Sequence, residues 1–376
     1  MNKSMIYADH SATTRLSDEA FQAMLPYMQD IFANASQPYS LARPAKQALT
    51  RAREMIANII HANPHEIYFT SGGTESDNWA IKGAALSPES AKRQTILTSS
   101  IEHHAVLHSC KALENQGFCV RYLPVNHKGV LSKEILLSRL DHDVSLVSVM
   151  LANNEIGTIE PIQQLCSITH EYGALFHTDV VQALGHISVD VQQLGVDLLS
   201  ASAHKFYGPK GVGFLYIRDS CKLGAFHDGG KQEFGRRAGT ENIAAAVGMA
   251  YALKSCYDSL ETETNRLKSL AKMLVDELQG LDFICNGSEE RLPGHLSLSF
   301  RGMSGESLLH RLDLMRIFVS TGSACNSDVL EASHVLSAIE VPEEYALGTI
   351  RISLGRDNED EDVHRIAWAL RHIILG

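Results

Sequence analysis

Lys205 lies in a setting that favours covalent chemistry. It follows an uncharged run, residues 198–203, and a glycine-containing turn comes soon after it. A lysine that is removed from water has a lowered pKa, so its amine can act as a nucleophile and form a Schiff base. Ser202 and His204 flank it and could hold a phosphate. A surface lysine in a turn, as we expect for Lys210, is the alternative interpretation.

Residues 71–78 form a second segment of interest, because two glycines precede an expected helix start there. Glycines let backbone N–H groups close on an anion, and the helix dipole adds to the attraction. Gly73 and Thr74 are therefore candidate phosphate ligands, the threonine through its hydroxyl group. A plain helix cap, for which serine and threonine are also favoured, is the alternative.

Asp179 comes directly after a buried strand expected at residues 174–178. An acid in that position is costly unless it is paired. A protonated pyridine nitrogen would pair with it, and this ion pair makes a pyridoxal ring a better electron sink. A strand-end aspartate that caps the next helix is the alternative. Together, a phosphate cradle, a Schiff-base lysine and an acid for a ring nitrogen serve one cofactor, pyridoxal 5'-phosphate.

The cysteines and histidines are the residues of this chain that could bind a metal or supply a thiol nucleophile. Seven cysteines occur at wide spacing without a CxxC pair, so neither a disulfide framework nor a zinc knuckle is expected. Cys325 differs because it lies in a run of small polar residues, 320–327, which predicts an exposed loop with a reactive thiol. A surface thiol without a role is the alternative. His104 and His108 have the i, i+4 spacing of a metal pair, but no third ligand is near, so no metal site is expected.

Arg351 interrupts an otherwise apolar strand expected at residues 349–354. A buried arginine needs an acidic partner, and a substrate α-carboxylate could supply one through two parallel hydrogen bonds. An internal salt bridge is the alternative interpretation.

Alternating strand and helix patterns must position these residues. Strands are expected at seven apolar runs: 67–70, 95–99, 120–124, 145–150, 174–178, 198–202 and 213–217. Helical stretches, such as 42–60 and 105–116, lie between them. The alternation predicts an α/β fold with a mainly parallel seven-stranded sheet and helices on both faces. Ligands of such sheets bind beyond the carboxyl ends of the strands, where most of the segments above lie.

The pattern changes after about residue 255. Elements of a smaller α+β domain are expected there: a charged helix at 258–280, strands at 294–300 and 349–354, and helices at 306–314 and 359–374. We therefore predict a large cofactor-binding domain at 16–255. Residues 1–15 and 256–376 are predicted to form a small domain that carries the cysteine loop.

The composition argues against several classes of protein. The 376 residues are 44% hydrophobic and 20% charged, as in an ordinary globular protein. A net charge of -11 argues against a nucleic-acid or anionic-membrane surface. No apolar run is long enough to predict a transmembrane helix, and the first residues lack a signal pattern, so a cytoplasmic location is expected.

Ordered motifs along nearly the whole chain resemble those of the cysteine desulfurases, which belong to the class V aminotransferase family and to fold type I of the pyridoxal-phosphate enzymes. The motifs lie at 7–14 (YADHSATT), 73–78 (GTESDN), 102–106 (EHHAV), 153–157 (NNEIG), 204–211 (HKFYGPKG), 236–242 (RRAGTEN), 322–325 (GSAC) and 351–356 (RISLGR). The loops at 34–38 and 229–233 depart from the family pattern.

The resemblance implies a reaction and a role for each residue. The chain is expected to convert L-cysteine to L-alanine and to keep the sulfur as a persulfide on Cys325. Catalysis is assigned to Cys325, Lys205 and His104: Lys205 carries the cofactor, and His104 stacks on the ring, whose nitrogen pairs with Asp179. The remaining cofactor ligands are Gly73, Thr74, Asn154, Gln182, Ser202, His204, and Thr240 from a second subunit. The substrate is expected to be bound by Arg351, Asn34 and Asn154.

The resemblance also implies partners. A homodimer is expected, together with a sulfur-acceptor protein, either an iron–sulfur scaffold or a thiolation enzyme, whose identity the sequence leaves open. One alternative is another enzyme of this fold, such as a selenocysteine lyase or an aminotransferase, although transamination has no use for the Cys325 thiol. The other is a non-catalytic sulfur-transfer scaffold, against which the combination of Lys205, Asp179 and Cys325 argues.

Overall fold

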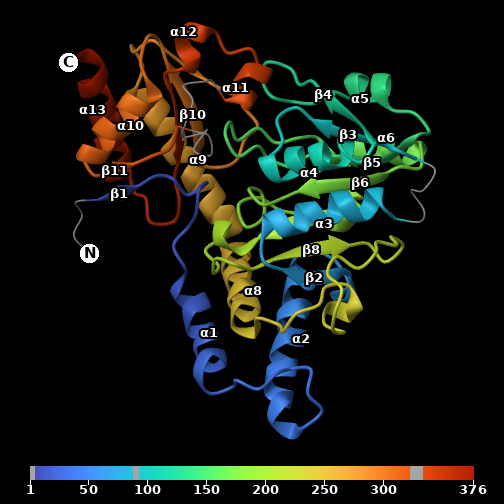
Figure 1. The fold of residues 1–376 in the computed structure, drawn as a ribbon. Helices are drawn as coiled ribbons and strands as arrows, with labels where there is room; N and C mark the ends of the chain where they lie inside the picture. The colour runs from blue at the N-terminus through green and yellow to red at the C-terminus, as the bar shows by residue number, and fades with distance from the viewer. Residues whose placement is uncertain (1–4, 88–92, 322–332) are drawn as a thin grey trace.

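The computed structural model describes residues 5–87, 93–321 and 333–376 of the chain (Figure 1). The GSAC motif, and with it Cys325, lies outside the described residues.

A seven-stranded sheet forms the centre of the larger part of the molecule (Figure 1). Its order is β2-β8-β7-β6-β5-β3-β4. The strands are β2 (Ile67–Thr70), β3 (Thr95–Ser99), β4 (Cys119–Leu123), β5 (Val144–Ser148), β6 (Leu175–Asp179), β7 (Leu198–Ser202) and β8 (Gly213–Ile217). Within this sheet β8 pairs antiparallel with both neighbours, and the other pairs are parallel. The predicted α/β fold with a mainly parallel seven-stranded sheet is thus confirmed.

Helices cover both faces of this sheet. The helices of this part are α1 (Asp18–Gln29), α2 (Arg43–Ile59), α3 (Gly73–Ala85), α4 (His104–Glu114), α5 (Lys133–Arg139), α6 (Ile162–Glu171), α7 (Val191–Leu194) and α8 (Ile243–Asp258). On one face, α3 and α4 share a core with Leu198 and Leu215. On the other face, α2, α6 and α8 pack over Leu199 and Phe214.

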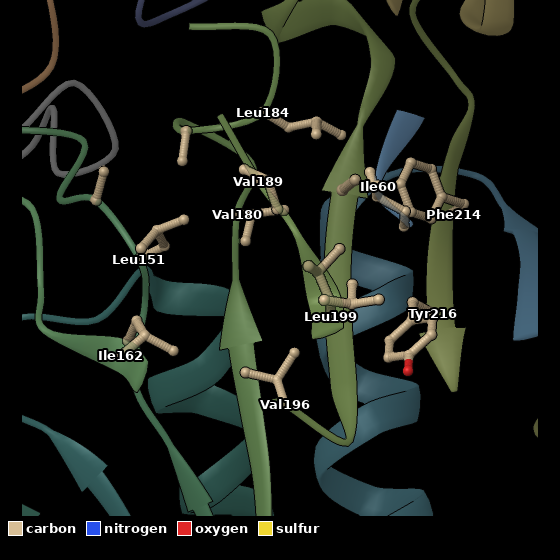
Figure 2. Packing of buried hydrophobic residues seen from close by; sticks show 14 of the residues in the cluster. Ile60, Leu151, Ile162, Val180, Leu184, Val189, Val196, Leu199, Phe214 and Tyr216 are labelled. Carbon is tan, nitrogen blue, oxygen red and sulfur yellow. The ribbon is translucent and has the colours of Figure 1, made fainter. Parts of the chain in front are cut away.

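The side chains of β7 and β8 alternate between these two cores. Figure 2 shows Leu199, Phe214 and Tyr216 in one of them, next to Ile60 and Val180. Strands that are buried on both faces consist of nearly continuous apolar residues, which is why the runs predicted strands with bounds within two residues of those observed. Burying each such side chain contributes roughly 1.5–3 kcal/mol.

A second core lies in the smaller part of the molecule (upper left in Figure 1). Its elements are α9 (Leu260–Glu277), β9 (Phe283–Cys285), β10 (His295–Phe300), α10 (Gly305–Leu314), β12 (Thr349–Ser353) and α13 (Asp360–Leu375), with the short pair β1 (Ile6–Tyr7) and β11 (Ile317–Phe318). The short helix α12 (Glu343–Ala346) lies against β10. Helix α11 (His334–Ala338) instead packs through Val335 and Leu336 into the core of the larger part. The sheet β12-β10-β9 is antiparallel. Residues Ile6 and Ala8 belong to this core. The domain limits at 15/16 and 255/256 stay a prediction.

The charged helix predicted at 258–280 differs from the observed elements. Residue Asp258 ends α8, and α9 begins at Leu260. Between them Ser259 leaves the helical region, with φ of -119° and ψ of 10°. The apolar helix α8 packs on α1 and α2, so tertiary contacts fix where it ends. No helix in the described ranges is long and apolar enough to cross a membrane.

Candidate active site

A cavity of about 230 Å³ lies beyond the carboxyl ends of β2, β3, β5, β6 and β7. This is the edge at which sheets of this kind bind ligands. Its lining residues are Gly73, Thr74, Asp77, His103, Met150, Asn154, Asp179, Val181, Gln182, Ser202, His204 and Lys205. The structure thus brings together most of the predicted cofactor residues, and adds Asp77 and His103, to which the sequence had assigned no role.

The start of α3 makes one wall of the cavity. Its N-cap, Gly72, has a φ of +150°, and Gly73 opens the helix. A Cβ added at Gly73 would lie 2.7 Å from Cγ2 of Val181, so no side chain fits there. Backbone N–H groups at a helix start attract anions, and glycine lets a ligand approach them closely. Ser202 lies against the same turn.

Lys205 follows β7 in a short 3-10 turn, Ala203–Lys205. Its Nζ donates hydrogen bonds to the carbonyl oxygens of Ser11 (2.6 Å) and Ala12 (2.8 Å). His186 contacts the carbonyl oxygen of Lys205 through Nε2 at 2.9 Å. Both the backbone and the amine of this lysine are therefore held in place, and the amine lies where the N-terminal segment reaches the cavity.

Asp179 is the last residue of β6 and is buried. Burial raises the pKa of its carboxyl to about 6, although the Val181 N–H (2.7 Å) and the charge of Lys205 both favour the ionised form. The hydrogen bond to Val181 also caps the next turn, which was the alternative interpretation of this residue. A further cation in the cavity would stabilise the carboxylate.

A second buried acid, Asp77, extends from α3 into the same cavity. Its Oδ1 lies 3.7 Å from Nε2 of His177 and has no hydrogen-bond partner among the described residues. Burial and the charge of Asp179 raise the pKa of Asp77 well above its usual range, which favours the protonated form of this carboxyl. Burial lowers the pKa of His177 to about 3, and its ring nitrogens contact Ser148 (2.8 Å) and Ser200 (2.9 Å).

The imidazole in the cavity wall belongs to His103, whereas the sequence had assigned the ring-stacking role to His104. His103 is the N-cap of α4, and its Nδ1 accepts a hydrogen bond from the Ala105 N–H (3.1 Å). Burial and the charge of Lys205 lower its pKa to about 4, so the ring is neutral.

His104 is the first residue of the helix, and its ring centroid lies 5.1 Å from that of His108 and 5.0 Å from that of His334. It is not among the residues that line the cavity. In the part of the chain that the structure describes, no group of three His, Cys, Asp or Glu side chains could hold a metal ion.

Arg351, in β12, is buried and forms an ion pair with Asp9, with 2.8 Å between Nη2 and Oδ1. The internal salt bridge that the sequence left open is therefore present. Its Nη1 donates to the carbonyl oxygen of Asn154 (2.9 Å), whose side chain lines the cavity. The Nε is buried and has no hydrogen-bond partner among the described residues.

Other predicted residues lie away from the cavity lining or outside the description. Oδ1 of Asn34 accepts a hydrogen bond from the Ser36 N–H (2.9 Å). Thr240 is exposed. The segment that contains Cys325 is not described, but Ser320, shortly before it, exchanges backbone hydrogen bonds with Arg351. After it, Nε2 of His334 contacts the carbonyl oxygen of Glu102 (3.1 Å).

Comparison with known proteins decides the family. The aminotransferase class-V profile matches residues 6–366. The chain is 48% identical to the cysteine desulfurase IscS of Dictyoglomus turgidum (strain DSM 6724 / Z-1310) over 375 residues, which cover 99% of this chain and 95% of that protein. This chain belongs to the aminotransferase class-V family.

Solved structures agree with the class V assignment. A NifS-like protein matches with a TM-score of 0.93 and 37% identity, over 99% of both chains. A structure of SspA in complex with cysteine matches with a TM-score of 0.83 and 34% identity, over 93% of this chain and 98% of that one. The family resemblance predicted from the ordered motifs is confirmed.

The sequence did not predict two features of this site, the position of His103 and the contact of His177 with Asp77. The choice between His103 and His104 depends on which of them caps α4, and an extended residue before a helix turns its side chain back toward the helix start. His177 and Asp179 are two residues apart on β6 and so share one face of the sheet, a period that could have drawn attention to His177. Its partner Asp77 comes from a different segment, so the contact could be found only in the fold.

Proposed function

We propose that this chain is a pyridoxal-phosphate-dependent cysteine desulfurase, which converts L-cysteine to L-alanine and keeps the sulfur as a persulfide on Cys325. The observation that carries the proposal is the cavity in which Lys205, Asp179 and the start of α3 meet. The relatives support the reaction, because the protein that is 48% identical is a cysteine desulfurase and the solved SspA structure contains cysteine.

The cavity residues fit pyridoxal phosphate. The start of α3, with no room for a side chain at Gly73, would receive the phosphate. Asp179 would pair with the ring nitrogen, which supplies the cation that the buried carboxylate needs. The phosphate ligands proposed are Thr74, Ser202 and His204, and the ring-edge ligands are Asn154 and Gln182. When bound, the cofactor supplies an electron sink for the substrate α-carbon.

Lys205 has two tasks in this proposal. Its amine would hold the cofactor and would also act as the base that takes the α-proton of the substrate. The carbonyl oxygens of Ser11 and Ala12 hold Nζ in place, so the released amine stays near the substrate. Orienting a base in this way lowers the entropic cost of proton transfer.

We assign to His103 the role first given to His104. Because Nδ1 of His103 accepts the Ala105 N–H, the proton of the neutral ring is on Nε2. Such a ring can stack on the cofactor and exchange a proton with the substrate thiol. The ring of His104 instead lies against His108 and His334.

The sulfur leaves through Cys325. Its thiolate attacks the substrate sulfur, so an S–S bond forms while the bond between that sulfur and the β-carbon breaks. The electron pair passes to the substrate carbon, which is then protonated and released as alanine. One L-cysteine and one thiol thus give one alanine and one persulfide.

Arg351 is proposed to bind the substrate carboxylate even though it already pairs with Asp9. Its buried Nε is the donor that lacks a protein partner among the described residues, and it could donate to a carboxylate oxygen. The contact of Arg351 with the Asn154 backbone would place that carboxylate beside the cavity. Asn34 is proposed as a further carboxylate ligand.

We further propose a homodimer in which Thr240 of each subunit reaches the phosphate site of the other. The exposed position of Thr240, away from the cavity lining of its own chain, is consistent with this. A cytoplasmic location and transfer of the persulfide to an iron–sulfur scaffold or a thiolation enzyme complete the proposal. A selenocysteine lyase would use the same cavity, but the likeness to the cysteine-bound SspA structure favours cysteine.

The test uses purified protein loaded with pyridoxal phosphate and supplied with L-cysteine. Alanine and enzyme-bound persulfide should form in equal amounts in a single turnover, and borohydride should fix the cofactor to Lys205. Cys325→Ala should still bind the cofactor but make no persulfide. Cys119→Ala, at an exposed cysteine in β4, is the matched control and should behave as wild type. Multiple turnovers of alanine from Cys325→Ala would overturn the proposal.

A further inference from the structure

Between β8 and α8, the residues around Glu233 lie against the edge strand β2. The N–H of Phe69, in β2, donates to Oε2 of Glu233 (2.9 Å). The ring of Phe234 lies 5.8 Å from that of Tyr68, also in β2. From here the chain continues into residues 236–242, which we call the Thr240 turn.

A buried ion pair fixes Glu233. Nη1 and Nη2 of Arg53, from α2, each donate to one carboxylate oxygen of Glu233 at 2.8 Å. Both side chains are nearly fully buried. The guanidinium also lies over the ring of Phe69 at 4.6 Å and over that of Phe234 at 5.1 Å. Two parallel hydrogen bonds of this kind fix the orientation of the carboxylate relative to the guanidinium as well as the distance between them.

The backbone beside this pair is strained. Glu233 and Phe234 have φ values of +46° and +58°, a region that residues with a Cβ rarely adopt. Each such residue costs roughly 1–3 kcal/mol, so the surrounding contacts must impose the conformation. The strained turn directs the Phe234 side chain outward, where 61% of it is exposed.

A second ion pair holds the Thr240 turn itself. Nε of Arg237 donates to Oε1 of Glu75 (2.8 Å), and Nη2 donates to Oε2 (3.1 Å). Glu75 is in the first turn of α3, next to the cavity residue Thr74, and also accepts the Ser71 N–H (2.8 Å). The start of the turn is therefore tied to the cavity wall through Arg237, and the residues just before it are tied to the core through Glu233.

Protection of the edge strand is a simpler explanation, but it does not account for all of these contacts. An exposed charge or a proline suffices to block an edge. A buried ion pair costs desolvation and adds little net stability, and its best-attested use is to fix the relative position of segments. The strained turn at Glu233 and Phe234 comes before Arg236, and the second ion pair, at Arg237, comes after it. Such an arrangement is expected where the position of the following loop, the Thr240 turn, matters.

We propose that Glu233 is a positioning residue of the cofactor site, because its buried pair with Arg53 and the strained turn beside it hold Thr240 in the place where it completes the cavity of the second subunit. This inference rests on the proposed dimer. Glu233 touches neither cofactor nor substrate in this scheme and acts through Thr240.

A double-mutant cycle on the full-length protein tests the link, with the dissociation constant of pyridoxal phosphate as the readout. Glu233→Gln should raise this constant about tenfold or more. Glu263→Gln, which removes a two-pronged but partly exposed pair with Arg266 within α9, should leave it unchanged. Glu233→Gln combined with Thr240→Ala should bind no more weakly than Thr240→Ala alone, because both changes act on one contact. Wild-type affinity in Glu233→Gln, or full additivity, would overturn the inference.

Mixed dimers test the direction of the effect. Glu233→Gln subunits keep an intact Lys205, and Lys205→Ala subunits keep an intact anchor. In a mixed dimer, the cavity of the Glu233→Gln subunit should therefore bind the cofactor with wild-type affinity. If that cavity stays weak, Glu233 serves its own subunit and the proposal fails. Where Glu233→Gln does not fold, Arg237→Gln at the partly exposed second anchor repeats both tests.

The readout separates this inference from the proposed reaction. Wild-type protein that bound pyridoxal phosphate but released no alanine from L-cysteine would overturn the reaction. The cofactor affinities of the variants would still decide the role of Glu233.

Discussion

At the scale of residues, burial sets the charges around the cavity. It raises the pKa of Asp179 to about 6 and raises that of Asp77 well above its usual range, and it lowers the pKa of His103 to about 4 and that of His177 to about 3. The imidazoles are neutral and burial favours the protonated form of Asp77, which leaves Asp179 as the carboxylate that can pair with a ring nitrogen. Environments that separate the pKa values of neighbouring groups mark acid–base sites.

The two adjacent histidines should differ in their effect on the reaction. Replacing His103 with glutamine removes the imidazole from the cavity wall, and the rate of alanine release should fall by about 10²-fold or more, as on loss of a general acid or base. His104→Gln is the matched control, because that ring lies outside the cavity lining, and its rate should stay near that of wild type. Steady-state alanine assays decide between them. Equal losses in both variants would contradict the assignment.

Glu102 gives a prediction about pH and stability. Burial raises its pKa from 4.5 to about 8, so the folded protein holds this proton more tightly than the unfolded chain does. Protonated Glu102 makes its full contribution to the free energy of unfolding below pH 4.5, where the unfolded chain is protonated as well. This contribution is lost as the pH rises through about 8, the pKa in the folded protein. Glu102→Gln, which is neutral throughout, should therefore gain in Tm relative to wild type as the pH rises from about 5 to about 8.

The expected gain is roughly 2–4 °C for each kcal/mol of stability. Thermal unfolding at several pH values measures it, with Glu54→Gln on the exposed face of α2 as control. A Tm difference between Glu102→Gln and wild type that is the same at every pH would show that Glu102 ionises normally.

At the scale of elements, the sequence predicted what local patterns determine. Apolar runs such as 198–202 and 213–217 become strands with the expected bounds. Both faces of these strands are buried, so a continuous apolar run predicts each strand without knowledge of the elements that cover it. The break at Ser259 and the pairing of Arg351 with Asp9 depend on contacts between distant segments. The motifs therefore predicted most of the residues that line the cavity, whereas the packing decided which of two histidines lines it.

The start of α3 offers a test at this scale. Gly73→Ala would bring a Cβ to 2.7 Å from Val181, so the first turn of the helix would have to move. Overpacking of this kind costs about 1–3 kcal/mol, and if the bound state requires the original turn, the affinity for pyridoxal phosphate should fall by about 5- to 150-fold. Gly224→Ala is the control, because no atom lies within 4 Å of its added Cβ. Spectroscopic titration with the cofactor measures both, and unchanged binding by Gly73→Ala would argue against a phosphate at this turn.

At the scale of the whole molecule, exposed apolar side chains are the surface at which we expect the proposed second subunit to bind. Several gather on α1 and the residues that follow it, which project from the sheet in Figure 1: Phe21, Met28, Phe32, Tyr39 and Leu41. Clusters of this kind commonly mark protein interfaces. Ser36, in the same stretch, hydrogen-bonds to Glu241 next to Thr240 (3.3 Å). The stretch after α1 and the Thr240 turn are thus in contact through Ser36, as a shared interface would require.

If the dimer shares its sites, lesions in different subunits should complement each other. Thr240→Ala would damage the cavity of the partner, and Lys205→Ala would inactivate its own. A mixed dimer would then place both lesions in one site and leave the other intact. With random pairing, half of the dimers are mixed and each has one working site, so about a quarter of the wild-type activity should return. Both parent variants, assayed alone, set the baseline. Activity that stays at this baseline, although mass spectrometry of the native complexes shows mixed dimers, would mean that Thr240 acts within its own subunit.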